Sequence, residues 1–554
     1  MPPSKLKTAL ECLSMRSVES VQDGNVLGSF DCYMHVSRPI EDKLRQRMKA
    51  IDASGGGIVL LVGSAGDGKS HLISTMKREF DWASTCYYND ATASCSPRKT
   101  AIETLKEALV DFKDDSIGST DRKLVLAINL GKLNALIDED DVRDEYRQLV
   151  NAVEPIFDED DSTPPIESDR IKVVLFTNEQ IFEFYPEDDG AYPVKSSFLA
   201  SILDKIVAPV DGNPFYQAYV EDGQNGTNPA DPIRLNYELL SLPEVRRTVE
   251  MSVIEAIICS RLLITPREFL DFVYSILVPT VMPHEPSALD CEVMLPSLIY
   301  GGGRNMILQA LSNLDPLKYS STAHDRLLSI LFTANAISEA DSSILEQGLP
   351  EVMVNRLNGM YSNNGHDTLC VAKFVYRLQH VLSYHSENED YLSYLALLKG
   401  VFNGSSEDMQ DVYELVSKSI PRHCGSYYDK QDMVPLSIQG GKYRMFSSLK
   451  LEPEEIVAPF SCSNRTEFFL RFNLSWRISG EKVILTMDYQ LYAYLRDLCR
   501  GKLALSYENE RDLTFSDFVG ALARMCDCSK EISIVRNDGK EMVLKEIFKS
   551  IQLQ

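Results

Sequence analysis

The spacing of apolar residues in the first third of the chain predicts a parallel sheet flanked by helices. Four short apolar segments have the composition of strands, at residues 58–62, 85–89, 123–128 and 171–177. Apolar residues recur at helical spacing in the segments that alternate with them, at residues 39–51, 70–82 and 99–112. Strands that alternate with helices form parallel sheets whose faces the helices cover. The expected fold of this region is therefore α/β.

The rest of the chain has a different pattern. Apolar residues keep a helical period from residue 236 to about 410, and strand composition returns at 467–473 and 482–486. Residues 532–544 are typical of a hairpin that turns at Asn537-Asp-Gly, and the polar stretch 222–231 predicts an exposed loop. The expected parts are N-terminal helices at 1–54, the α/β core at 55–235, a helical lid and helical domain at 236–450, and a small α+β C-terminal domain at 451–554.

Composition narrows the classes of function. Acidic residues outnumber basic residues by 81 to 56, which gives a net charge of −25. A surface that binds nucleic acid needs clustered Lys and Arg, so we expect this chain to hold DNA weakly, if at all, by itself. The twelve cysteines lack paired CxxC spacing, and the eight histidines lack an HExxH spacing. Neither a zinc site nor a disulfide framework is therefore expected.

The sequence has no pattern typical of secretion or of a membrane span. Its first residues lack the charged and then apolar layout of a signal peptide. The most apolar later stretch, 269–282, is interrupted by Asp271 and is too short to cross a bilayer. We expect a soluble, cytoplasmic protein without membrane contacts.

The glycine-rich segment after the first strand carries the strongest functional signal. Its sequence, Gly63-Ser-Ala-Gly-Asp-Gly-Lys-Ser70, matches GxxxxGK[ST] between a predicted strand and a predicted helix. In such loops Gly66 and Gly68 would let N–H groups surround phosphate oxygens, Lys69 would bridge the β- and γ-phosphates, and Ser70 would bind Mg²⁺. The sequence therefore predicts a P-loop NTPase domain with ATP and Mg²⁺ as cofactors. The predicted nucleotide-binding residues are Gly63, Ser64, Ala65, Gly66, Asp67, Gly68, Lys69, Ser70 and His71.

Hydrolysis normally also requires an acidic residue at the end of another strand, and its position has two interpretations. In the first, the strand at 123–128 occupies the Walker B position but ends in Asn129, and Asn178 after the fourth strand senses the γ-phosphate or water. In the second, Asn129 is the sensor and Asp90 supplies the acid. A third possibility is a nucleotide-binding subunit with slow turnover.

Arginines further along the chain could complete the site. Thr265 can cap a helix that Pro266 opens, which places Arg267 in the first turn of a predicted lid helix. Arg267 is therefore a candidate sensor of the γ-phosphate. Arg246 and Arg247 are alternatives for this role, including across a subunit interface.

Several of these segments together resemble one family. The segments are His35-Val-Ser-Arg-Pro-Ile-Glu-Asp-Lys-Leu, Leu61 to Ile73 around the glycine-rich loop, Ala127-Ile-Asn-Leu-Gly131, Asn213-Pro-Phe-Tyr216 and Thr265-Pro-Arg267. They resemble the DptF family, the P-loop ATPase component of bacterial restriction systems that depend on DNA phosphorothioation. The resemblance covers most of the chain and is strongest from 35 to 280. It implies an AAA-like NTPase in which Lys69 and Ser70 have the phosphate and Mg²⁺ roles.

The resemblance also implies a role in antiviral defence. With partner subunits, such a chain would act on DNA that lacks the phosphorothioate modification, and a homo-oligomer is an alternative for its own assembly. It would reach DNA indirectly through partners, and it would not be the nuclease, because no PD…(D/E)xK pattern stands out. The competing interpretation is a regulatory NTPase switch or scaffold with slow or no turnover. A small-molecule kinase fits less well, because such enzymes are usually compact single domains.

Overall fold

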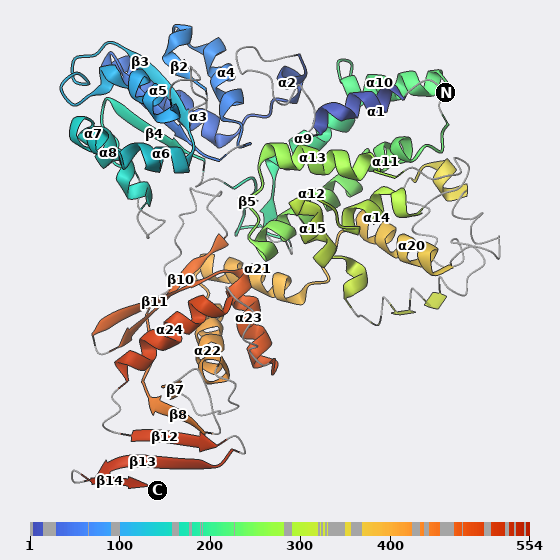
Figure 1. The fold of residues 1–554 in the computed structure, drawn as a ribbon. Helices are drawn as coiled ribbons and strands as arrows, with labels where there is room; N and C mark the ends of the chain where they lie inside the picture. The colour runs from blue at the N-terminus through green and yellow to red at the C-terminus, as the bar shows by residue number, and fades with distance from the viewer. Residues whose placement is uncertain are drawn as a thin grey trace. The chain divides into compact units, whose positions relative to one another are not determined.

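The computed structural model places the chain in two compact units, which we describe separately (Figure 1). One unit comprises 1–181, 196–250 and 263–384, and the other comprises 182–195, 251–262 and 385–554. The described residues are 4–14, 29–64, 66–89, 100–157, 165–176, 180–188, 190, 192–226, 228–281, 291–319, 322, 325–326, 329–330, 349–355, 368–423, 433–436, 443–454, 470–478, 480–502, 511–526, 531–536, 539–547 and 550–553.

The first unit contains the parallel sheet that the sequence predicts. Its strands are β1 (Gly57–Val62), β2 (Tyr87–Tyr88), β3 (Lys123–Ile128) and β4 (Ile171–Leu175), in the order β2-β3-β1-β4. β1 is central, since it pairs in parallel with β3 on one side and with β4 on the other. All six residues of β1 are buried, as expected for a strand covered on both faces.

Helices cover both faces of the sheet. Alternate residues of β1 point to opposite faces, so each face has its own apolar core. Val59 and Leu61 pack in one core with apolar residues of α3 (Pro39–Ser54) and α4 (Lys69–Glu79). Ile58, Leu60 and Val62 pack in the other core. The helices of that second face are α5 (Ala101–Ala108), α6 (Leu130–Ile137), α7 (Asp140–Glu145) and α8 (Arg147–Val153).

Two predicted elements of this region are shorter than expected. The strand predicted at 85–89 has only two paired residues, because a 3₁₀ turn at Ser84–Cys86 precedes β2. The helix predicted at 99–112 begins after Thr100, whose side chain forms a capping box with Glu103, and it continues beyond α5 as a 3₁₀ turn at Val110–Phe112.

The remainder of the first unit is mostly helical, as predicted. Its helices are α1 (Lys5–Leu10), α2 (Ser29–Met34), α9 (Ser197–Val207), α10 (Pro214–Gln224), α11 (Pro232–Leu240), α13 (Pro266–Leu277), α14 (Leu295–Tyr300), α15 (Met306–Asn313) and α20 (Thr368–Leu382). Helix α12 (Pro243–Ser260) contributes residues to both units. Further 3₁₀ turns are Glu11–Leu13, Glu154–Phe157, Cys291–Val293 and Pro316–Lys318.

The prediction of an exposed loop at 222–231 is wrong at its start. Helix α10 continues to Gln224, and Asp222 is buried with 5% of its surface exposed. Its carboxylate accepts from the hydroxyl of Ser4 at 2.7 Å and from the N–H groups of Lys5 and Leu6 at 2.9 and 3.0 Å. Asp222 therefore satisfies the free N–H groups at the start of α1, a contact across more than 200 residues that local sequence does not reveal.

The second unit combines helices with small antiparallel sheets, which agrees with the α+β expectation for the end of the chain. The helices are α21 (Glu389–Phe402), α22 (Ser406–His423), α23 (Tyr489–Cys499) and α24 (Arg511–Met525). One sheet has the order β11-β10-β9, with β11 at Glu481–Met487, β10 at Phe472–Ile478 and β9 at Glu452–Pro453. The strands β5 (Glu183–Phe184) and β6 (Val194–Lys195) form a short pair.

A five-stranded sheet lies at the end of the second unit, in the order β14-β13-β12-β8-β7. The strands are β7 (Met433–Pro435), β8 (Tyr443–Ser448), β12 (Glu531–Arg536), β13 (Glu541–Ile547) and β14 (Ser550–Leu553). The antiparallel pairing of β12 with β13 confirms the hairpin predicted at 532–544. Of the strand predicted at 467–473, residues 467–469 lie outside the described residues, and its last two residues belong to β10, where Phe472, Leu474 and Trp476 alternate toward the core.

Candidate functional site

The glycine-rich loop leaves the central strand of the parallel sheet at the sheet's carboxyl edge. The N–H of Gly63 donates to the carbonyl oxygen of Ile128 at the end of β3, at 3.2 Å. On the other side, the N–H of Phe176 donates to the carbonyl oxygen of Val62 at 2.8 Å. The start of the loop is therefore fixed by both neighbouring strands, and α4 begins immediately after it at Lys69.

The backbone of the loop demands glycine at three of its positions. A side chain at Gly63 would begin 2.5 Å from Oδ2 of Asp67 and 2.8 Å from Cβ of Phe176, so it would clash with both. Gly66 and Gly68 each have a φ of +91°, a conformation that other residues rarely adopt. The glycines of the motif are therefore explained by the shape of the loop.

The side chains of Lys69 and Asp67 fold back onto the loop. Nζ of Lys69 donates to the carbonyl oxygen of Gly63 at 2.8 Å and also to that of Ser64. The Asp67 carboxylate accepts from the N–H of Ser64. Burial raises the pKa of Asp67, although the charges of Lys69 and Arg38 and the hydrogen bond from Ser64 oppose the rise. The loop thus holds one ammonium group and one half-buried carboxyl group in close proximity.

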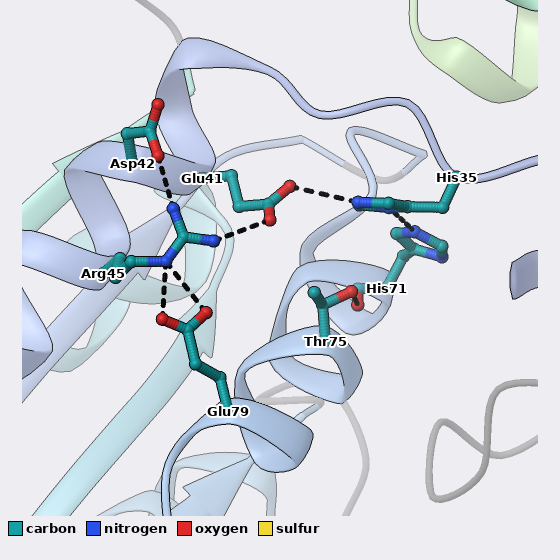
Figure 2. A network of polar contacts seen from close by, with 7 residues as sticks. All are labelled: His35, Glu41, Asp42, Arg45, His71, Thr75 and Glu79. Atoms are coloured by element: carbon teal, nitrogen blue, oxygen red, sulfur yellow. Dashed lines mark hydrogen bonds and ion pairs between the residues drawn. The ribbon is translucent and has the colours of Figure 1, made fainter.

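The first turn of α4 carries Ser70, which is exposed, and His71, which belongs to a polar network (Figure 2). Nε2 of His71 lies 2.7 Å from Nδ1 of His35, and the two rings stack with centroids 5.0 Å apart. Nε2 of His35 lies 3.4 Å from the carboxylate of Glu41. Burial, together with the neighbouring His35, lowers the pKa of His71 from 6.5 to about 4. His71 is therefore neutral at pH 7.

The network continues from Glu41 to Arg45 and joins α3 to α4. A guanidinium nitrogen of Arg45 lies 3.0 Å from Oε1 of Glu41, and Nε of Arg45 donates to both carboxylate oxygens of Glu79 at 2.7 and 2.8 Å. Arg45 also pairs with Asp42. Figure 2 shows this arginine between carboxylates of the two helices. Because Glu41 is buried, its charge needs such a partner.

Arg38, the residue immediately before α3, contacts the loop from the outside. One of its terminal nitrogens donates to the carbonyl oxygen of Asp67 at 2.7 Å. Its guanidinium carbon lies 5.4 Å from the ring centroid of Phe176 and 5.5 Å from that of Phe198, at the start of α9. Both rings are buried, with 8% of each residue exposed. The side chain thus links the loop to the end of β4 and to α9.

The structure brings one of the proposed strand-end residues next to the loop. Asn129 follows β3 and caps α6, because its side-chain oxygen accepts from the N–H of Lys132 at 2.8 Å. The strand β2 is not adjacent to β1, because β3 lies between them in the sheet. Asp90, Asn178 and Ala65 lie outside the described residues. Both interpretations of the acid therefore stay open.

The segment that contains Arg267 also lies against the loop. The hydroxyl oxygen of Thr265 is only 3.0 Å from the position that a Cβ would take at Gly66. Thr265 caps α13 and Pro266 opens it, as predicted, and Glu268 completes a capping box with Thr265. Arg267 is exposed in the first turn of this helix. The structure therefore places the predicted helix start beside the loop.

The two alternative arginines have different surroundings. Nε of Arg246 lies 2.8 Å from a carboxylate oxygen of Asp204, and another of its nitrogens donates to the carbonyl oxygen of Ser241 at 2.7 Å. Arg247 is exposed. Arg246 therefore has a local structural role on the helices α9 and α12.

The sequence alone indicates no role for Arg38 or His35, although both are in a segment that carries the family resemblance. Their partners lie 29 and 36 residues away in the chain. The sequence signal for Arg38 is its position immediately before a proline that opens a helix. This signal does not reveal the contacts of Arg38, because they depend on how α3, β4 and α9 pack together.

Comparisons with known proteins add no further constraint, because no family model, no curated protein and no solved structure matches this chain. Within the described ranges, no helix has both the length and the apolar character required to span a membrane. The same residues include no cluster of three or more His, Cys, Asp or Glu side chains suited to a metal ion.

Proposed function

We propose that this chain binds ATP and Mg²⁺ at the loop formed by residues 63–70. One observation carries the proposal: a turn with positive φ at Gly66 and Gly68 connects the central strand of a parallel sheet to the first turn of α4. Such a backbone can turn N–H groups to one side, and the start of a helix adds partial positive charge. The phosphates of a nucleotide suit a loop with these properties.

Two side chains would complete the binding of the nucleotide. Lys69 would neutralise phosphate charge, because its long side chain can exchange the carbonyl oxygens of Gly63 and Ser64 for phosphate oxygens. Ser70 would offer its exposed hydroxyl to Mg²⁺. When bound, Mg²⁺ supplies positive charge that stabilises the phosphoryl group during transfer. Arg267, two residues after Thr265 in the first turn of α13, would contact the γ-phosphate.

We further propose that the chain hydrolyses ATP as the ATPase subunit of a multi-subunit restriction complex that acts on DNA lacking phosphorothioate modification. The family resemblance around the loop supports this role, and the net charge of −25 supports a division of labour in which partner subunits hold the DNA. A gel shift at physiological salt should accordingly detect weak or no binding of DNA by the purified chain. Tight binding without partners would contradict this division.

One observation favours the alternative of a regulatory switch with slow turnover. The strand end next to the loop carries the amide of Asn129, whose oxygen caps α6, rather than a carboxylate. Phosphate release that DNA and partner subunits stimulate would favour the restriction ATPase. Binding of ATP with negligible turnover in the same mixture would favour the switch.

Two substitutions test where the acid lies. If Asp90 organises Mg²⁺ and water, Asp90→Asn should leave ATP affinity nearly unchanged and should lower turnover by about 100-fold or more. If β3 instead occupies the Walker B position, Asn129→Asp should raise turnover and Asp90→Asn should do little. Phosphate release is measured with partner subunits present. If neither variant changes turnover, the acid comes from another residue or from a partner.

A further inference from the structure

The contact between Arg38 and the carbonyl oxygen of Asp67 has a consequence for the opposite side of the loop. The peptide bond between Asp67 and Gly68 is trans, so the carbonyl of Asp67 and the N–H of Gly68 point in opposite directions. A terminal nitrogen of Arg38 donates to the carbonyl oxygen of Asp67 at 2.7 Å, which fixes the direction of this carbonyl. The same contact therefore keeps the N–H of Gly68 pointing away from Arg38.

The backbone at this position would otherwise have considerable freedom. Gly68 lacks a Cβ and has a φ of +91°, and glycine loses more conformational entropy on ordering than any other residue. A peptide plane next to such a residue can rotate unless an external contact fixes it. The space is also closely matched to the arginine, since a Cβ at Gly68 would lie 3.0 Å from a terminal nitrogen of Arg38.

The guanidinium is itself held by contacts with two aromatic rings. It lies near the rings of Phe176 and Phe198, at 5.4 and 5.5 Å from their centroids, and both aromatic residues are buried. A planar cation between aromatic rings has fewer orientations than a free arginine side chain. Phe198 belongs to α9, so the orientation of Arg38 depends on how that helix packs against the sheet region.

We propose that Arg38 is a positioning residue of the loop: it fixes the Asp67–Gly68 peptide so that the N–H of Gly68 points toward a bound phosphate. This inference rests on the proposed binding of ATP at residues 63–70. It adds that part of the affinity comes from an arginine outside the motif and that Phe198 transmits the packing of α9 to the phosphate-binding backbone.

Calorimetric titration with a nonhydrolysable ATP analogue and Mg²⁺ tests the proposal. Arg38→Ala should weaken binding by about 10-fold to 100-fold, the equivalent of a charge-assisted hydrogen bond. Arg38→Lys keeps the charge without the planar fork and should lose an intermediate amount. Phe198→Leu should weaken binding by about 2-fold to 5-fold through the lost ring contact. Thermal melting verifies that each variant is folded.

A matched control is Arg47→Ala. Arg47 lies on α3, the helix that Arg38 precedes, and pairs with Glu167 at 2.7 Å, so its removal should leave affinity unchanged. Millimolar guanidinium chloride should restore binding to Arg38→Ala, whereas equal concentrations of KCl should not, because only guanidinium can occupy the vacated contact. A purely structural loss would not respond to guanidinium.

The outcomes separate this inference from the proposed function. If Lys69→Ala binds the analogue like the unaltered chain, the proposed function fails. If Lys69→Ala loses binding but Arg38→Ala matches Arg47→Ala, only the positioning role fails. If Arg38→Ala does not fold, the comparison of Arg38→Lys with Arg47→Lys decides, and equal affinities would overturn the role.

Discussion

The central strand β1 of the first unit and the strand β11 of the second unit differ in which of their faces are buried. All six residues of β1 are buried, whereas β11 alternates between buried Val483 and Leu485 and exposed Lys482 and Ile484. A strand covered by helices on both faces can present chemistry only at its ends. The glycine-rich loop accordingly begins where β1 ends, at the carboxyl edge of the sheet, where open α/β sheets bind their ligands.

Polar side chains also serve different purposes in the two units. Around the loop, Arg38 and Lys69 donate to backbone carbonyl oxygens of the loop itself. In the second unit, His423 connects three helices, because its ring nitrogens lie 2.7 Å from the hydroxyl of Tyr494 and 2.9 Å from that of Ser516. Polar contacts hold the backbone of the loop in the first case and join packed helices in the second.

The largest expected difference concerns stability. Leu61→Thr in β1 should destabilise the first unit by about 3 kcal/mol or more, because it removes buried apolar volume and buries a hydroxyl. Ile484→Thr in β11 should change stability by about 0.5 kcal/mol or less, because 53% of Ile484 is exposed. Hydrogen exchange of β1 and β11 peptides in urea measures each unit separately. Equal effects of the two substitutions would contradict the comparison.

Acid should weaken the region around the loop through His71. The folded pKa of His71 is lowered from 6.5 to about 4, so the unfolded chain takes up this proton more readily than the folded chain. This difference in pKa contributes about 3 kcal/mol to the free energy of unfolding. The contribution is fully present above about pH 6.5 and is lost progressively toward about pH 4. His71→Asn should flatten the dependence of α4 protection on pH in that window. A slope identical to that of the unaltered chain would refute this assignment.

A smaller effect is expected from Asp67. A bound phosphate would raise the pKa of Asp67 further above its already raised value. Binding would then take up a proton, so the affinity for the nucleotide would increase as the pH falls through the pKa of Asp67. Asp67→Asn keeps an oxygen that can accept from Ser64 but cannot be charged. It should raise the affinity for an ATP analogue by about 3-fold to 10-fold and flatten its pH dependence. Calorimetry at several pH values measures both, and weaker binding of the variant would count against it.

Sequence patterns predicted the elements whose cause is local. The unbroken apolar run at 58–62 predicted a buried strand, and Thr265 followed by Pro266 predicted the start of α13. The glycine-rich motif likewise predicted a loop between a strand and a helix, and in the structure Gly66 and Gly68 of this loop have positive φ values. These features depend on side chains within a few residues of each other, so a single sequence contains the necessary information.

The features that sequence missed depend on contacts between distant segments. Asp222 was assigned to an exposed loop because its neighbours are polar, yet it is buried against the start of α1. The strand β2 is short because a 3₁₀ turn replaces its first residues. Arg38 contacts Phe198, which is 160 residues later in the chain, and no local pattern encodes that pairing.

The most direct test of the account is the affinity of Lys69→Ala for a nonhydrolysable ATP analogue with Mg²⁺, measured by calorimetric titration. Lys69 is the lysine of the loop, and its amine already contacts two loop carbonyl oxygens. We expect the affinity of Lys69→Ala to be lower by about 100-fold or more, because a charge-assisted contact with the phosphates disappears. The control variant Lys49→Ala, exposed on α3, should bind like the unaltered chain. Unchanged affinity of a folded Lys69→Ala protein would contradict the assignment of the loop as a nucleotide site.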